Sequence, residues 1–298
     1  MTRILDLYGH GLASLKGPDL VAAIKAAEGR TLLAEIVAPS PPLVDAVSNV
    51  ELVAAFGADL VCLNKVDPRR ALVSGLAIDG FRDLAGLLGR PVGLNLEPDL
   101  ESVPRELRAT EEAVRAAQQG GAAFVFVTAN PGRKATITDL ARATETVRGA
   151  APELLCVTGK MHAAGADEPL TGKTVESFLA AGAQGVLVPL PGTVPGITED
   201  LAHDMVQIAQ AAGALAVGTI GTSQEGADLE TVRALALAAK RIGVDVHHIG
   251  DAGYSSGIAP PDNVYAYSMV IRGRRHTWAR MASNIRVSWK KGGPDELS

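Results

Sequence analysis

Short apolar segments recur along this chain at a nearly constant spacing. Each is rich in Val, Leu or Ile, and each is followed by the 3.6-residue periodicity of an amphipathic helix. The segments begin near Thr31, Asp59, Arg90, Ala122, Leu154, Gly185, Ala214 and Val244, so successive starts differ by 28 to 32 residues. Because a βαβ unit takes roughly 30 residues, this spacing predicts eight strand–helix units and a parallel sheet covered by helices.

Eight evenly spaced units predict an α/β fold of the closed (β/α)8 TIM barrel type. An open doubly wound sheet is the alternative, but its first turn is usually rich in glycine. The first turn here is Ala38-Pro39-Ser40-Pro41-Pro42, and its prolines lack the N–H groups that a pyrophosphate needs. We expect a single barrel domain over residues 1–298, with an N-terminal extension over 1–30 that closes one end, a long C-terminal helix and a loose tail over 292–298.

Composition and charge narrow the classes of function. The chain is 47% hydrophobic and 20% charged, as soluble domains usually are. The net charge is −5 and the basic residues do not form a stripe along the chain, which argues against a nucleic-acid partner. There is no apolar run of membrane-spanning length and no signal-like start, so we expect a cytoplasmic protein without a membrane partner.

Polar residues gather at the carboxyl ends of the apolar segments, where barrel enzymes place their chemistry. Alternation along each strand predicts which of them face the barrel axis. This inward-facing set is Glu35, Asn64, Asn95, Glu97, Thr128, Asn130, Lys160, His162, Thr219 and Asp251. At the eighth segment two choices stay open, His247 with Asp251 or His248 with Gly250. Because burying polar groups is costly, the set predicts either a ligand pocket or a network of ion pairs that plugs the barrel mouth.

Lys160 and His162 are the most reactive pair in this set. They stand two residues apart and are expected to project to the same side of one strand. A partly desolvated lysine acts as a base or forms an imine, and histidine moves protons near neutral pH. Alternatively, Lys160 only neutralises Glu97 or contacts an anionic substrate. The predicted catalytic residues are Glu97, Lys160, His162 and Asp251, and the predicted substrate-binding residues are Glu35, Asn64, Asn95, Asn130, Thr219 and His248.

A magnesium ion is a further option at the same rim. Asn95, Glu97 and Asp251 carry the oxygen ligands that Mg²⁺ prefers. No closely spaced acidic pair of the Asp-x-Asp kind stands at a strand end, so the need for a metal stays open.

The loops after the seventh and eighth segments are rich in Gly, Ser and Thr. Many barrels bind a phosphate where these two loops meet, through backbone N–H groups. The predicted phosphate-binding residues are Gly221, Thr222, Gly250 and Gly253, and the expected partner is a small anionic metabolite.

Several longer strings carry a family resemblance. They are Gly89-Arg90-Pro91-Val92-Gly93-Leu94-Asn95-Leu96-Glu97-Pro98, Phe56-Gly57-Ala58-Asp59, His248-Ile249-Gly250-Asp251-Ala252-Gly253-Tyr254, Tyr265-Ala266-Tyr267 and Arg272-Gly273-Arg274-Arg275-His276-Thr277. Together they resemble, over nearly the full chain, a bacterial family of barrels often labelled phosphoenolpyruvate phosphonomutase-like. The resemblance implies a TIM barrel, a small phosphorylated substrate and carbon-centred lyase or isomerase chemistry.

The chain departs from phosphoenolpyruvate mutases and isocitrate lyases at their key loop. Those enzymes carry a Lys-Lys/Arg-Cys-Gly loop and a closely spaced acidic Mg²⁺ site, whereas the fifth segment here ends in Gly159-Lys160-Met161-His162-Ala163. Phosphonomutase chemistry itself is therefore not implied.

The leading hypothesis is an enzyme with lyase, aldolase or isomerase chemistry on a small phosphorylated or carboxylated metabolite. One alternative is a metal-dependent hydrolase or lyase with ligands among Glu35, Glu97, His162 and Asp251. Another is a non-catalytic ligand-binding regulator or assembly factor on a barrel scaffold. The aromatic residues Tyr265, Tyr267 and Trp278 of the last helix favour a homo-oligomer, unless they belong to the core.

Overall fold

Eight parallel strands close into a barrel in the computed structural model, which describes residues 2–160, 166 and 168–289. The strands are β1 (Thr31–Val37), β2 (Leu60–Asn64), β3 (Val92–Leu96), β4 (Phe124–Val127), β5 (Leu155–Thr158), β6 (Gly185–Pro189), β7 (Leu215–Ile220) and β8 (Val246–Ile249). Each strand pairs with the next, and β8 pairs with β1. The predicted TIM barrel is confirmed, and every strand begins within two residues of its predicted start.

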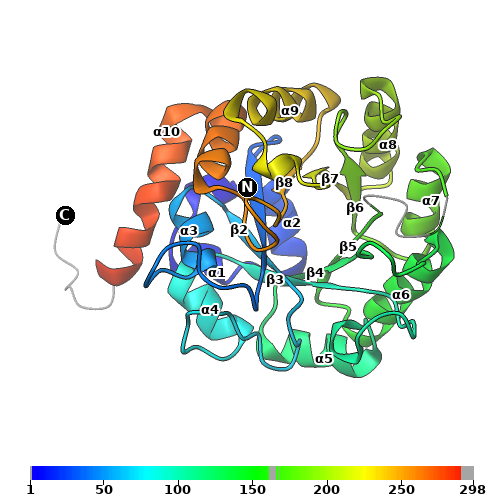
Figure 1. Ribbon diagram of the computed structural model, residues 1–298, viewed down its shortest axis with the longest axis horizontal. Helices are drawn as coiled ribbons and strands as arrows, with labels where there is room; N and C mark the ends of the chain where they lie inside the picture. The colour runs from blue at the N-terminus through cyan, green and yellow to red at the C-terminus, as the bar shows by residue number, and fades with distance from the viewer. Residues whose placement is uncertain (1, 161–165, 167, 290–298) are drawn as a thin grey trace.

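Helices surround the strands (Figure 1). The α-helices are α1 (His10–Ala13), α2 (Gly17–Lys25), α3 (Asn49–Ala55), α4 (Phe81–Leu88), α5 (Glu111–Gly120), α6 (Ile137–Ala150), α7 (Gly172–Ala180), α8 (Glu199–Ala211), α9 (Leu229–Ile242) and α10 (Pro261–Trp289). Short 3-10 helices lie at η1 (Ile4–Asp6), η2 (Arg105–Leu107) and η3 (Gln224–Gly226). Several helices begin at side-chain caps; Ser48 with Glu51 and Thr136 with Asp139 form capping boxes, which satisfy N–H groups of the first turn.

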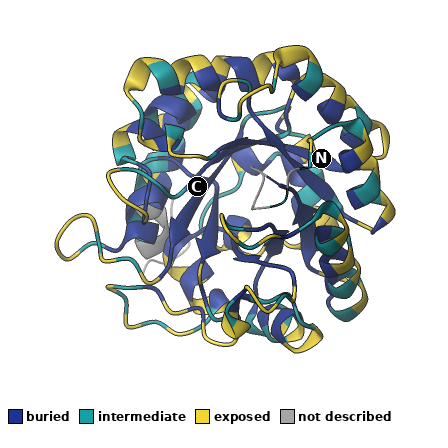
Figure 2. Ribbon diagram, turned by 45° about the vertical axis from the view of Figure 1, so that its right-hand side comes forward, coloured by how far each residue is buried: buried dark blue, intermediate teal, exposed yellow. Residues whose placement is uncertain are grey.

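Apolar side chains fill both faces of the barrel wall, so the strands are buried throughout while the helices expose their outer sides (Figure 2). One cluster lies between strands and helices, and a second fills the barrel interior. The interior cluster includes Leu12, Leu20 and Ile24 of the N-terminal extension together with strand residues such as Leu33 and Phe124. The extension therefore closes the amino-terminal end of the barrel, as expected, and the polar site is left to the opposite end.

The C-terminal helix α10 is broken at Gly273, whose φ of 71° is not helical. Tyr267 is fully buried in the core, whereas Trp278 is 53% exposed and donates its indole N–H to the Tyr265 hydroxyl at 3.3 Å. The aromatic residues of this helix thus divide between core and surface, and a homo-oligomer stays a prediction. Within the described part of the chain, none of the helices combines the length and apolar character needed to cross a membrane.

A buried cluster of charges attaches α10 to the amino-terminal end of the barrel. Asp59 accepts the backbone N–H of Leu32 at 2.8 Å and forms ion pairs with Arg272 at 2.5 Å and with Arg280 at 2.6 Å. Arg90, also fully buried, donates to the carbonyl of Ala58 at 2.8 Å. Arg272 from the motif quoted above therefore has a structural partner, and the positive neighbours hold the pKa of Asp59 below its usual value despite burial.

Replacing Asp59 with Asn should destabilise the protein strongly. The substitution leaves buried arginines without their counter-charge, and we expect the free energy of unfolding to fall by about 3–5 kcal/mol. Urea denaturation measures this loss. Glu199→Gln is the control, because Glu199 pairs with Arg241 on the surface and should change stability by less than about 1 kcal/mol. Equal losses in the two variants would contradict the structural role of Asp59.

Candidate active site

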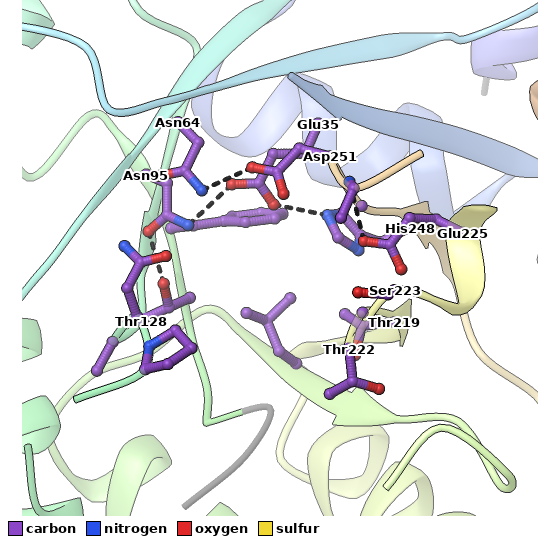
Figure 3. A pocket seen from close by; sticks show the side chains of 18 of the residues that line it. Glu35, Asn64, Asn95, Thr128, Thr219, Thr222, Ser223, Glu225, His248 and Asp251 are labelled. Carbon is purple, nitrogen blue, oxygen red and sulfur yellow. Dashed lines mark hydrogen bonds and ion pairs between the residues drawn. The ribbon is translucent and has the colours of Figure 1, made fainter. Parts of the chain in front are cut away.

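A cavity of about 550 Å³ opens at the carboxyl ends of the strands (Figure 3). Described residues from seven of the eight strands, or from the loops that follow them, line it. The described lining residues are Glu35, Asn64, Asn95, Phe126, Thr128, Ala129, Asn130, Pro131, Gly132, Leu187, Thr219, Gly221, Thr222, Ser223, Glu225, His248, Gly250, Asp251 and Ala252. All six predicted substrate-binding residues are among them.

A chain of hydrogen bonds crosses the floor of this cavity from β8 to β4. Nε2 of His248 lies 2.9 Å from Oε2 of Glu35, and the Asn95 amide donates to Oε1 of the same carboxylate at 2.9 Å. Thr128 donates to the Asn95 carbonyl at 2.7 Å. The ring of Phe126 packs against His248 with 5.8 Å between ring centroids. Both oxygens of Glu35 are thereby engaged, and the imidazole is held in one orientation.

This arrangement determines which nitrogen of His248 is left to react. When Glu35 is ionised it can only accept, so Nε2 carries the proton and Nδ1 keeps a lone pair. Nδ1 is buried and has no hydrogen-bond partner among the described residues. A neutral imidazole with an oriented, unpaired Nδ1 is a proton acceptor.

Asp251 lies beyond the end of β8 on the same wall. Its Oδ2 accepts the Asn64 amide at 2.8 Å, while Oδ1 of Asn64 accepts the backbone N–H of Lys65 at 2.9 Å. Burial, and next the negative charge of Glu35, raise the pKa of Asp251 to about 6. Of the two choices at the eighth segment, the structure agrees with His248 and Gly250, which both line the cavity, while His247 lies on the outer side against Tyr267. Asp251, assigned to the other choice, lines the cavity as well.

Glu225 is a cavity residue that strand alternation missed. The turn after β7 passes through Thr222 and Ser223, both with positive φ, and brings the Glu225 carboxyl back between His248 and Ser223 (Figure 3). Its Oε1 accepts the backbone N–H of Ala252 at 3.1 Å, whereas Oε2 is buried without a hydrogen-bond partner among the described residues. Burial raises the pKa of Glu225 to about 7.

The phosphate site predicted for the β7 and β8 loops gains no support from this geometry. Gly221, Thr222 and Gly250 do line the cavity, but Gly253 does not. The carboxyl of Glu225 lies where these loops meet, and a Cβ added at Gly250 would approach its Oε1 to 2.7 Å. Of the described residues that line the cavity, none is Lys or Arg. The anion held by these loops is thus a side chain of the protein itself.

The structure does not bring Lys160 to the cavity, which corrects the inward orientation predicted for it. Its ammonium donates to Oε2 of Glu168 at 3.0 Å and to the carbonyl of Ala166 at 3.2 Å, and its side chain is almost fully buried. The predicted partner His162 lies outside the described residues.

The error at β5 comes from reading its two faces the wrong way round. Leu155 and Val157 belong to the cluster inside the barrel, whereas Cys156 belongs to the cluster under the helices. The hydroxyl of Thr158 lies 2.7 Å from that of Thr144 on α6. Thr158 therefore also faces the helices, and the same alternation leads Lys160 away from the axis.

Glu97 lies just outside the cavity lining, although Asn130 belongs to it. Its carboxylate accepts the backbone and side-chain N–H groups of Asn130, each at 2.9 Å, and pairs with Arg133 at 3.1 Å. These contacts fix the β4 loop against the end of β3. Glu97 is thus placed as a loop anchor rather than beside His248.

Among the described residues, the metal ligands proposed from the sequence do not form a group, and His162, one of the proposed ligands, lies outside these residues. The part of the chain that the structure describes contains no group of three or more His, Cys, Asp or Glu arranged to hold a metal ion. Glu97 is engaged by Asn130 and Arg133, apart from Asp251. Mg²⁺ as a cofactor stays an untested prediction.

The raised pKa of Glu225 predicts a pH-dependent stability. A carboxyl whose pKa is about 7 when folded and near 4.5 when unfolded stabilises the fold below pH 4.5 and loses that contribution as the pH rises through 7. Glu225→Gln removes the titration and keeps the acceptor for Ala252, so above pH 7 the variant should be more stable than the wild type by about 3 kcal/mol. Urea denaturation across this range measures the difference. A constant difference between the two proteins at all pH values would contradict it.

Comparison with solved structures supports the fold assignment. A Rubisco-like protein from Rhodopseudomonas palustris is 15% identical, with a TM-score of 0.51 over 89% of this chain and 72% of that one. A 2,3-dimethylmalate lyase of the PEP mutase/isocitrate lyase superfamily is 11% identical (TM-score 0.49; 80% of this chain and 81% of that one), and a Schiff base-forming fructose-1,6-bisphosphate aldolase is 13% identical (TM-score 0.48; 88% and 95%). Similarity at this level concerns the barrel fold and not the reaction.

The sequence comparisons give a family but no activity. No curated protein matches the chain in sequence. The model of one family covers residues 5–287. The chain therefore belongs to the family described as a domain of unknown function, DUF7916.

Proposed function

We propose that this protein is an enzyme that moves protons on a small organic substrate, in an isomerisation or lyase reaction with His248 as the general base. The observation that carries this proposal is the Glu35–His248 pair in the cavity at the carboxyl ends of the strands, with an N···O distance of 2.9 Å. A carboxylate that orients a histidine and leaves its second nitrogen unpaired is a recurrent proton-transfer device.

The proposed reaction begins with removal of a proton from a carbon next to a carbonyl group. Nδ1 of His248 accepts this proton, and the C–H electron pair forms the carbon–carbon double bond of an enol. The carbonyl oxygen takes a proton from Asp251 or Glu225, whose pKa values of about 6 and about 7 leave part of each protonated near neutral pH. In an isomerisation of a hydroxy-carbonyl compound, His248 returns its proton to the former carbonyl carbon, while the neighbouring hydroxyl gives its proton to the carboxylate and becomes the new carbonyl. In a lyase reaction, the enol hydroxyl returns its proton to the carboxylate and the carbonyl re-forms. The leaving group then departs from the β carbon with its electron pair and takes the proton held by His248.

The neighbouring residues support the base rather than react. The charge of Glu35 stabilises the imidazolium that forms, and Asn95 keeps this carboxylate in place with its bond to Oε1. Thr128 in turn orients the Asn95 amide. Because these partners are already oriented, their dipoles need not reorient as charge develops on the imidazole, which lowers the activation free energy.

The rival mechanisms receive less support. An imine mechanism needs a lysine at the cavity, and Lys160 is engaged by Glu168 outside it. A metal-dependent mechanism needs a ligand set that the described residues do not assemble. The hypothesis of a non-catalytic regulator predicts the same pocket without a reaction in it. Only a test of reactivity therefore distinguishes this hypothesis from that of an enzyme.

Exchange of carbon-bound hydrogen with solvent tests the proposal directly. We expect the wild type to incorporate deuterium from D₂O into at least one member of a panel of small hydroxy- and amino-carbonyl compounds, followed by proton NMR. His248→Gln keeps a donor toward Glu35 but cannot accept the proton, so exchange should fall by at least about a hundredfold.

His247→Gln is the matched control, because His247 is the adjacent residue of β8 and lies on the opposite side of the strand. This variant should keep the exchange rate of the wild type when both are folded by circular dichroism. Exchange that survives in His248→Gln, or ligand binding by the wild type without exchange of any compound, would refute the enzymatic proposal.

A further inference from the structure

The cavity has an unusual balance of charge. Glu35 from β1, Glu225 after β7 and Asp251 after β8 bring three carboxyl groups to one wall (Figure 3). None of the described lining residues is Lys or Arg. Among the described lining residues, His248 is the one basic side chain, because Lys65 is exposed beyond the lining and acts on Asp251 only at longer range. A buried carboxyl without a counter-charge is expensive, so this wall favours a ligand that supplies one.

Two acceptor atoms on this wall are unsatisfied. Glu225 is 2% exposed and its Oε2 has no hydrogen-bond partner among the described residues, and the same holds for Nδ1 of His248, which is 5% exposed. Figure 3 shows the Glu225 carboxyl beside the His248 ring. Buried polar atoms are nearly always paired in folded proteins, so two unpaired atoms on residues that line the same cavity indicate that a ligand completes the site.

We propose that the substrate is a small protonated amine, whose ammonium group donates to Oε2 of Glu225 while the carbon next to it presents its hydrogen to Nδ1 of His248. This inference rests on the proton-transfer function proposed above. Because Glu225 and His248 are neighbours in the cavity, the ammonium group and the reacting carbon are also neighbours in the substrate. Asp251, held by Asn64, remains the proton donor.

An organic cation fits this wall better than a metal ion. Mg²⁺ requires several oxygen ligands in near-ideal octahedral geometry. Both oxygens of Glu35 are occupied by Asn95 and His248, and the described residues provide no group of three metal ligands. An ammonium group needs only hydrogen-bond acceptors, with no fixed coordination geometry. Here Oε2 of Glu225 can accept a hydrogen bond from the ammonium group, and Nδ1 of His248 can accept the proton of the neighbouring carbon.

A charge series of matched ligands tests the proposal without any turnover. Serinol, glycerol and glycerate share one skeleton, and aminocyclohexanol, cyclohexanediol and hydroxycyclohexanecarboxylate share a larger one. In each set the three compounds are cationic, neutral and anionic. We expect the thermal shift and the affinity from calorimetry to follow the order cation, neutral, anion for at least one skeleton, with the cation about tenfold tighter than the neutral compound.

The variants assign the charge selectivity to one carboxyl. Glu225→Gln should lose about tenfold in affinity for the cation and little for the neutral compound. Glu101→Gln is the control, because Glu101 is exposed and its substitution changes the net charge by the same amount. This control should bind both compounds as the wild type does.

The outcomes separate this inference from the proposed function. Equal or tighter binding of the neutral or anionic compounds, no shift with either cation, or a shift with Mg²⁺ alone would overturn the amine substrate. Deuterium exchange that depends on His248 would still stand in each of these cases, because its panel also contains hydroxy-carbonyl compounds without an amino group. Loss of exchange with retained selectivity for the cation would instead overturn the enzyme and leave a cation-binding barrel.

Discussion

The hydrogen bond between Glu35 and His248 spans the seam at which β8 pairs with β1, where Leu33 and His248 are in register. Residues 213 positions apart meet there only because eight strands complete a circle. The same bond fixes the orientation of the imidazole, and with Asn95 it satisfies the Glu35 carboxylate. Closure of the barrel and orientation of the His248 imidazole therefore depend on the same bond. Any change that loosens the seam is expected to loosen the geometry of the proposed base as well.

A buried carboxyl group is paired with arginines at the amino-terminal end of the barrel, whereas the carboxyl groups that line the cavity at the carboxyl end have no such partner among the described residues. At the amino-terminal end Asp59 is ionised, because Arg272 and Arg280 contact it directly and a backbone N–H completes its shell. At the carboxyl end Asp251 and Glu225 lack such partners, and burial raises the pKa of each. A compensated charge stabilises the attachment of α10, whereas an uncompensated charge lowers stability and raises reactivity. This contrast favours the carboxyl end as the proposed functional one, independently of the general rule for barrels.

Spacing and alternation predicted much of this molecule, and their failures have physical causes. Spacing predicted all eight strands because the repeat length depends only on local chain geometry. Alternation oriented Glu35, Asn64 and Asn95 correctly, since each polar residue stands among apolar neighbours on the opposite face. It failed at β5, where the more polar face, with Thr158, lies against the hydroxyl of Thr144 on α6 instead of facing the barrel axis, and Lys160 follows that face. Alternation could not predict Glu225, because this residue lies outside the strands and its position depends on a turn with two residues of positive φ, Thr222 and Ser223.

The junction of the β7 and β8 loops explains why a glycine-rich sequence there need not bind phosphate. A phosphate group at this place would use backbone N–H groups such as that of Ala252, and here the Glu225 carboxyl accepts that N–H. Gly250 leaves the space that this side chain fills. An internal carboxyl thus occupies the place that a bound anion has in other barrels, and under our proposal the cavity selects a cation instead. A glycine-rich loop indicates only that the backbone can approach an anion closely. Whether that anion is a ligand or a side chain depends here on the position of Glu225.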